Sequence, residues 1–188
     1  LGDCNGHGTG SPCKRTGVFG RGVAISGLFG YLIGMHLLSV GTALPSHHYT
    51  QEELLEAFTR VWAKRHHNLA RVEQLHRAVM VGGRSLALPM EAYEELGGFG
   101  EANDAFIRVG TDLGEQAIRE ALSHAGLQAQ DVDAIFFTSV TGVAAPSIDA
   151  RLINRLGFRP DVKRTPIFGL GCVAGAAGTA RMYDYLRA

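Results

Sequence analysis

The stretch at residues 134–140 (AIFFTSV) limits the possible folds of this chain more than any other feature. It is a continuous, largely apolar run of strand length. A strand with one buried face alternates apolar and polar residues, whereas an unbroken apolar run is typical of a parallel strand covered on both faces. The sequence therefore predicts a buried parallel strand here, with other elements packed on both of its sides.

Helical patterns precede and follow this strand. Residues 103–125 carry apolar side chains at helical spacing, and Gly126 is well placed to end that helix. The next helix is expected to begin after Ser147, which is a favourable N-cap residue, and to end at Gly157. Both flanking patterns thus predict helices of ordinary length that can cover a sheet.

The N-terminal half carries signals of the same kinds. Residues 36–40 predict a strand. A capping box at 50–53 precedes an amphipathic helix that extends to about residue 66. A second helix is expected over 69–80, and a short strand over 84–88. Helices therefore connect the strands in this half as well.

A last strand is predicted at 164–168, directly before Cys172. Strands that alternate with helices in this way predict an α/β fold with a mostly parallel sheet and helices on both faces. In open α/β sheets, chemistry gathers at the carboxyl ends of the strands. We therefore expect Cys172 and the turn at 138–146 to line one pocket, because both follow strands.

Cys172 lies in the sequence FGLGCVAGAAG, where glycine and small apolar residues flank it on both sides. This pattern predicts a tight turn that leads into a closely packed helix. Unpaired N–H groups and the helix dipole at such a position favour a thiolate, which is the nucleophilic form. Cys172 is therefore a candidate for covalent acyl chemistry. The alternative is a small buried residue in a crowded helix, since free cysteine is often buried.

The composition argues against several classes of protein. Lys+Arg and Asp+Glu both number 18, so no net charge favours nucleic acid or a membrane surface as partner. No apolar run has the length of a membrane span. Three cysteines in 188 residues fit a reducing compartment better than a disulfide framework. We expect a cytoplasmic protein that binds neither nucleic acid nor membranes.

Residues 1–34 differ from the remainder of the chain. They are rich in glycine, begin at Leu1 and show little helical or strand periodicity. Met35 then opens the first predicted strand. We expect residues 1–34 to be an extension outside the fold and residues 35–188 to form one domain.

Three segments together resemble the type III polyketide synthases, the chalcone and stilbene synthase-like enzymes of the thiolase superfamily. The resemblance is close to the bacterial branch of the family and covers about 35–188. The segments are LGCVAGAAG at 170–178, TSVTGVAAPSIDAR at 138–151 and LGFRPDVKR at 156–164.

This resemblance implies the N-terminal half of a thiolase-like αβαβα fold, in a homodimer. It implies that Cys172 takes an acyl group from a starter coenzyme A thioester. Malonyl-CoA is then decarboxylated to an enolate that attacks this acyl group. The resemblance implies neither a cofactor nor a metal ion.

The resemblance also assigns roles to other residues. Thr141 would line the substrate cavity, and Ala145 stands where plant relatives place a methionine that reaches into the partner's cavity. Arg71, Arg77 and Arg84 lie in the segment where relatives bind the phosphates of coenzyme A, a task that suits guanidinium groups. A solvated helix face is the alternative interpretation of these arginines.

The family activates its cysteine with a histidine and an asparagine from a C-terminal half, and none of the eight histidines here matches that position. We therefore expect this chain to be the truncated N-terminal part of a longer synthase. Two alternatives stay open. One is a condensing enzyme related to β-ketoacyl-carrier-protein synthase III, which also uses a cysteine. The other is an inactive fragment or pseudo-enzyme.

Overall fold

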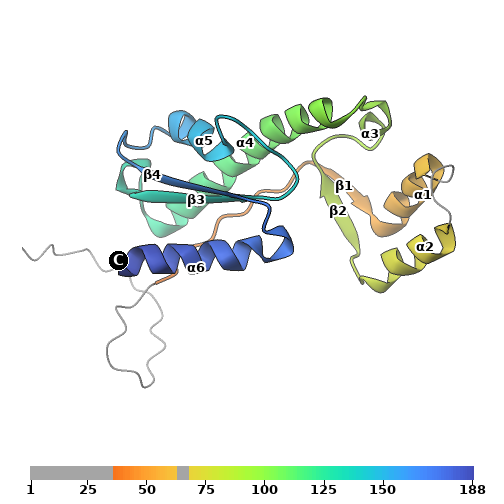
Figure 1. The fold of residues 1–188 in the computed structure, drawn as a ribbon, viewed down its shortest axis with the longest axis horizontal. Helices are drawn as coiled ribbons and strands as arrows, with labels where there is room; N and C mark the ends of the chain where they lie inside the picture. The colour runs from red at the N-terminus through yellow and green to blue at the C-terminus, as the bar shows by residue number, and fades with distance from the viewer. Residues whose placement is uncertain (1–35, 63–67) are drawn as a thin grey trace, which may run out of the picture. The chain divides into compact units, whose positions relative to one another are not determined.

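The computed structural model describes residues 36–62 and 68–188, without the side chain of Trp62. The extension predicted at 1–34 and the helix end predicted near residue 66 lie outside this description. Figure 1 shows the helices and strands, which in chain order are β1 (His47–Thr50), α1 (Gln51–Trp62), α2 (Leu69–Ala78), β2 (Gly83–Leu86), α3 (Ala92–Glu95), α4 (Phe99–Ala125), β3 (Ala134–Ser139), α5 (Ile148–Leu156), β4 (Lys163–Phe168) and α6 (Ala174–Arg187).

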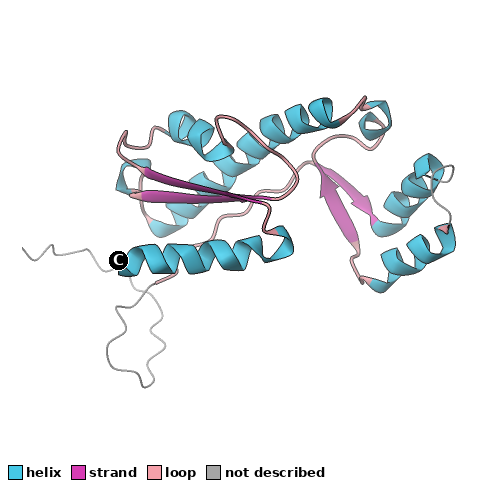
Figure 2. Ribbon diagram, in the orientation of Figure 1, coloured by secondary structure: helices cyan, strands magenta, loops and turns pink. Residues whose placement is uncertain are grey.

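Strands β3 and β4 form the parallel pair that the apolar run predicts. Ala134 lies opposite Lys163 at one end of the pair, and Ser139 lies opposite Phe168 at the other. Helix α6 covers one face of these strands, while α5 covers the other and α4 packs on α5 (Figure 2). The prediction of an α/β fold with parallel strands between helices is confirmed.

The core of this region lies on the inner side of α5. Ile148 and Leu152 are almost completely buried, with 1% and 2% of their surface exposed. A Cβ atom at Gly114 of α4 would lie 2.9 Å from a methyl carbon of Leu152. Because so little space remains there, glycine at 114 allows α4 and α5 to approach each other closely.

Strands β1 and β2 form a separate antiparallel pair, with His47 opposite Leu86. Helix α1 packs on both strands and on α2, and it buries Leu55 and Ala57. The residues of α2 are all exposed or half-buried. This region therefore has a small core of its own.

The capping box predicted at the start of α1 is confirmed. The backbone N–H of Thr50 donates to Oε2 of Glu53 at 2.7 Å, and the N–H of Glu53 donates to Oγ1 of Thr50 at 3.3 Å. The backbone N–H and the hydroxyl of Thr50 both donate to the carboxylate of Glu53 and favour its charged form, so they lower the pKa of Glu53 below its ordinary 4.5. A local sequence signal thus acts as expected.

The strand predicted at 36–40 is wrong. This segment has no strand structure and instead runs along α4, where the Ser39 hydroxyl donates to the carbonyl of Ala121 at 2.7 Å. A Cβ atom at Gly41 would overlap the backbone of Ala117. The segment contacts a helix, and a helix offers no free ladder of backbone groups with which a strand could pair.

The helix ends agree with the predictions in part. Gly126 and Gly157 end α4 and α5 in the left-handed conformation, at φ values of 67° and 68°. Ser147 occupies the N-cap position of α5, but its side chain makes no capping hydrogen bond. Within the described ranges, no helix has both the length and the apolar character that crossing a membrane requires.

Candidate functional site

Two glycines shape the turn that carries Cys172. Gly169 and Gly171 adopt φ values of 86° and 59°, and a Cβ atom at either position would meet no other atom within 4 Å. Glycine is therefore needed at both positions for the left-handed conformation and not for lack of space. The turn ends in a short 3₁₀ segment, Gly171–Val173, which leaves Cys172 exposed in front of α6.

The start of α6 packs tightly on β3 at one of its two glycines. A Cβ atom at Gly178 would lie 3.1 Å from Cγ2 of Thr138, and Gly178 is buried. Gly175 is exposed and has open space beside it. The close packing predicted from the run of small residues is therefore found at Gly178 and not at Gly175.

Residues 140–147, which we call the β3–α5 loop, lie beside this turn. The backbone N–H of Gly169 donates to the carbonyl of Ser139 at 3.1 Å, which extends the β3–β4 ladder into the turn. The Ser139 hydroxyl also donates to the carbonyl of Gly142 at 2.8 Å. The end of β3 thus holds both the turn of Cys172 and the β3–α5 loop.

Thr141 and Ala145 both lie in the β3–α5 loop and are exposed. The loop and Cys172 follow neighbouring parallel strands, so they share the carboxyl edge of the pair. The structure therefore brings the predicted nucleophile and the predicted cavity residues to the same edge of the sheet. Their roles in a reaction remain predictions.

Large apolar side chains are exposed around this edge, and sequence reasoning missed them. They come from the end of β4, from the turn of Cys172 and from the β3–α5 loop. Isolated exposed apolar residues are common, whereas a group of them marks a contact surface. The sequence carried a signal, since apolar residues stand next to the glycines in the turn of Cys172 and in the β3–α5 loop. The residues are Val140, Val143, Phe168, Leu170 and Val173.

The three predicted coenzyme A-binding arginines lie on α2 and β2. Arg77 forms ion pairs with Glu52 and Glu73, and the hydrogen bond that it donates to Glu52 is the main cause that raises the pKa of Arg77. In the described part of the chain, the side chains of Arg71 and Arg84 are exposed and have no ion-pair partner. Arg77 is thus already engaged by two carboxylates, and the role of all three remains a prediction.

Two hollows on the surface do not include Cys172. One of about 340 Å³ opens at the start of α1, between residues of α1 and α2 that include Arg77. Another of about 560 Å³ lies between α4 and α5, beside Thr111 and Arg155. Neither is lined by the turn of Cys172 or by the β3–α5 loop.

One buried charge near the site was also missed. Asp149 at the start of α5 is 0% exposed, and its Oδ2 lies 3.4 Å from Nη1 of Arg164 on β4. Its other oxygen, Oδ1, has no hydrogen-bond partner among the residues that the structure describes. The sequence indicated only a favourable interaction of this carboxylate with the helix dipole. The ion pair connects α5 to the strand that leads to Cys172.

Comparisons with known proteins agree with the fold. Residues 34–185 match the family model described as chalcone and stilbene synthases, N-terminal domain. A 1,3,6,8-tetrahydroxynaphthalene synthase of Streptomyces peucetius subsp. caesius is 50% identical over 153 residues, which are 81% of this chain and 41% of that protein. A phloroglucinol synthase of Pseudomonas fluorescens is 33% identical over 143 residues, which are 76% of this chain and 41% of that protein.

A solved structure gives the same result. The crystal structure of 1,3,6,8-tetrahydroxynaphthalene synthase from Streptomyces coelicolor A3(2), a bacterial type III polyketide synthase, superposes with a TM-score of 0.71 at 33% identity. The match covers 78% of this chain and 43% of that one, so the chain spans under half the length of these relatives. The likeness confirms the predicted thiolase-like α/β fold. The chain therefore belongs to the chalcone and stilbene synthase family and corresponds to its N-terminal domain.

Proposed function

We propose that this chain is the nucleophile-bearing N-terminal domain of a type III polyketide synthase, in which Cys172 carries the acyl chain. The observation that carries this proposal is the exposed thiol of Cys172 in a glycine turn at the carboxyl edge of the parallel pair. The names of the bacterial relatives, tetrahydroxynaphthalene synthase and phloroglucinol synthase, support aromatic polyketides as products.

The proposed reaction has two steps. In the first, the thiolate of Cys172 attacks the carbonyl carbon of an acyl-CoA thioester, and the carbon–sulfur bond to coenzyme A breaks as its thiolate leaves. In the second, malonyl-CoA loses carbon dioxide and becomes an enolate, whose carbon attacks the acyl group on Cys172. A carbon–carbon bond forms, and the bond to Cys172 breaks to restore the thiolate.

Other parts of the proposal concern the remainder of the enzyme. We place the domain at residues 35–188 and assign residues 1–34 to an extension. The histidine and asparagine that assist the cysteine in this family would come from a C-terminal domain, in a homodimer. Among the described residues, no hydrogen bond or ion pair joins Cys172 to a histidine. Assistance to the reacting carbonyl from elsewhere is consistent with that arrangement.

The substrate contacts follow from the placement of the predicted residues. Thr141 of the β3–α5 loop would line the acyl site that contains Cys172, and Ala145 of the same loop would face the cavity of the partner subunit. Arg71 and Arg84 are more available than Arg77 to bind the phosphates of coenzyme A, because the guanidinium of Arg77 is engaged by Glu52 and Glu73. A phosphate that bound Arg77 would have to displace those carboxylates.

Acyl transfer can be tested on the 188-residue chain by mass spectrometry. Incubation with acetyl-CoA should add one acetyl group, and peptide mapping should place it on Cys172. The addition should disappear in Cys172→Ala and persist in the matched control in which Cys4 and Cys13 are both replaced by serine. A chain that stays unmodified, or an acetyl group that persists in Cys172→Ala, would contradict the proposal.

Condensation needs a separate measurement. Release of carbon dioxide from malonyl-CoA reports the second step, and malonyl carrier protein as alternative donor reports the activity of a β-ketoacyl-carrier-protein synthase III. Preference for malonyl-CoA is expected. Acyl transfer without decarboxylation would support the alternative that the isolated chain is an inactive fragment for condensation.

A further inference from the structure

Asn103 of α4 makes a reciprocal pair of hydrogen bonds with a residue of the β3–α5 loop. Its Nδ2 donates to the carbonyl of Val143 at 2.8 Å, and its Oδ1 accepts from the N–H of Val143 at 2.9 Å. The carboxamide thus bonds both backbone groups of Val143, as a neighbouring strand would. This contact joins residues 40 positions apart in the sequence.

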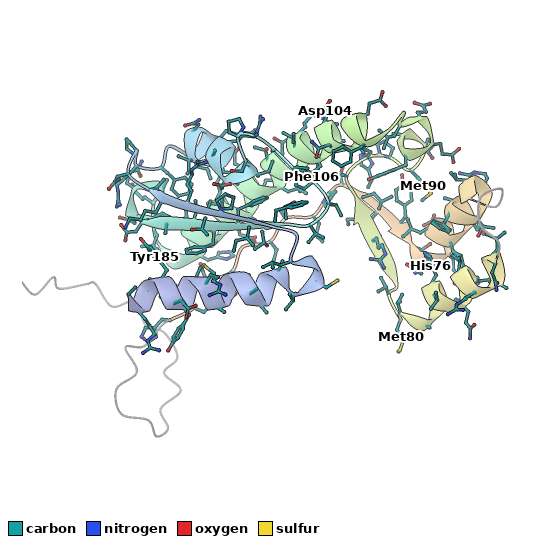
Figure 3. The ribbon with its side chains drawn as sticks, viewed as in Figure 1. His76, Met80, Met90, Asp104, Phe106 and Tyr185 are labelled. Atoms are coloured by element: carbon teal, nitrogen blue, oxygen red, sulfur yellow. The ribbon has the colours of Figure 1, made fainter. Side chains whose placement is uncertain are left out.

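A second side chain of α4 supports the same loop. A Cβ atom at Gly142 would overlap the ring of Phe106, which Figure 3 shows on α4, and Gly142 is buried. Asn103 and Phe106 lie one turn apart on the helix, so they present a polar and an apolar contact to adjacent loop residues. Helix α4 therefore restrains the centre of the β3–α5 loop by two independent contacts.

Helix formation gives no reason for asparagine at position 103. Asparagine is a poor helix former, because its short amide competes for backbone groups, and alanine is the best. Position 103 lies inside a helix that spans Phe99–Ala125. The pair with Val143 gives the side chain a purpose outside its own helix.

We propose that Asn103 is a positioning residue for acyl transfer at Cys172. Its carboxamide holds the β3–α5 loop, and with it Thr141, at the same edge of the sheet as the cysteine. The proposal rests on the proposed function, because the loop is treated as a wall of the acyl site. Asn103 itself touches the backbone of Val143 and acts only through the loop.

The consequence is a control of acyl selectivity. A wall held at two backbone atoms keeps one shape, so it accepts acyl chains of one size better than others. Without the pair, the loop samples more conformations and the preference between short and long acyl groups weakens. The reactivity of the thiol toward a small reagent depends little on this wall, since Cys172 is exposed.

The test compares Asn103→Ala, Asn103→Asp and Asn103→Gln in the full 188-residue chain. Rates of acyl loading on Cys172 are measured with acetyl-CoA and with octanoyl-CoA, and the thiol is alkylated with iodoacetamide as a size-independent probe. In Asn103→Ala, the ratio of the two loading rates should change by about fivefold or more, because both hydrogen bonds to Val143 are lost and one net hydrogen bond corresponds to about fivefold. Alkylation should stay unchanged.

The other variants grade the effect. Asn103→Asp keeps an acceptor for the N–H of Val143 but sets a second carboxylate oxygen against the Val143 carbonyl, so a change at least as large as that of Asn103→Ala is expected. Asn103→Gln retains both groups on a longer stem and should restore most of the selectivity. Hydrogen exchange of the loop peptide should accelerate about fivefold in Asn103→Ala, since the backbone N–H of Val143 loses its acceptor.

Gln116→Ala is the matched control, because Gln116 is an exposed amide side chain on the same helix. It should change neither the ratio nor the exchange. An unchanged loading ratio in Asn103→Ala, with loading intact in the parent, would overturn the positioning role alone. A parent chain that loads neither thioester would contradict the proposed function and the positioning role together.

Discussion

The antiparallel region (residues 47–86) and the parallel region (residues 99–187) differ in how much apolar surface they bury. The antiparallel region has a small core of Leu55 and Ala57, together with the capping box of Thr50 and Glu53 and exposed ion pairs such as that between Arg77 and Glu52. The parallel region relies on a closed core around Leu152 and on contacts distant in sequence, such as that between Asn103 and Val143. Exposed ion pairs contribute little to stability, whereas buried side chains contribute much.

The residues predicted for acyl transfer and those predicted to bind coenzyme A lie in different regions. The reactive cysteine belongs to the region with the larger buried core, and the arginines predicted to bind coenzyme A belong to the region with the smaller one. A nucleophile needs a fixed geometry to react. Phosphate binding by exposed arginines tolerates more freedom, because charge acts over longer distances. The comparison therefore predicts that stability and chemistry depend mainly on the parallel region.

The largest expected effect compares one leucine from each region. Leu152 is 2% exposed and Leu75 of α2 is 57% exposed. Leu152→Ala should lower the free energy of unfolding by about 2–5 kcal/mol, because it leaves a cavity between α4 and α5. Leu75→Ala should change it by less than about 0.5 kcal/mol. Urea denaturation measures both, and equal losses would show that the two regions do not differ in this way.

A smaller effect is expected from two glycines of the parallel region. Gly142→Ala places a methyl group against the ring of Phe106 and should cost about 1–3 kcal/mol of unfolding free energy through overpacking. Gly175→Ala adds the same group in open space within α6 and should stabilise the chain by up to about 1 kcal/mol. Thermal denaturation of both variants is the measurement. Stabilisation by Gly142→Ala would refute the tight contact with α4.

The capping box makes a smaller and purely local contribution. Thr50→Ala removes the side-chain acceptor at the start of α1 and should cost about 1 kcal/mol. Thr59→Ala is the control, since Thr59 is an exposed threonine later in the same helix. It should be neutral or slightly stabilising, because alanine is the better helix former. Circular dichroism during urea denaturation follows both, and identical curves would argue against the cap.

The smallest effect is a dependence of stability on pH. The hydrogen bonds from Thr50 lower the pKa of Glu53 in the folded chain below its ordinary 4.5. The charged carboxylate therefore stabilises the fold fully above that value, and the contribution disappears as the pH falls through the lower folded pKa. The stability difference between the parent and Glu53→Gln should shrink in acid. A difference that grows on acidification would reverse the assigned sign.

Much of the fold could be predicted because its signals are local. The apolar run of β3, the left-handed glycines at 126 and 157 and the capping box each depend on residues within a few positions of one another. The start of α4 was missed because Gly98 and Gly100 resemble a loop. In the structure, the carboxylate of Glu101 accepts from the N–H of Gly97 at 2.7 Å and compensates the helix start.

The candidate site could be predicted only in part. The sequence pattern and the family resemblance identified Cys172 and its turn, and the structure adds the exposure of the thiol. The apolar surface around it was missed although its residues are apolar in the sequence, and the pair of Asn103 with Val143 could not be inferred. A polar residue on a helix gives no sign of which distant backbone it meets, since that partner is set by how α4 packs on α5 and meets the loop before it.

The sequence by itself determined the order and type of most elements and the position of the reactive cysteine, because periodicity, caps and glycine turns act between near neighbours. Only the tertiary structure decided that residues 36–40 lie on α4 without forming a strand and that Asp149 is buried beside Arg164. It also decided that α4 supports the β3–α5 loop. These features depend on which surfaces meet, and side chains far apart in the sequence settle that when they pack together.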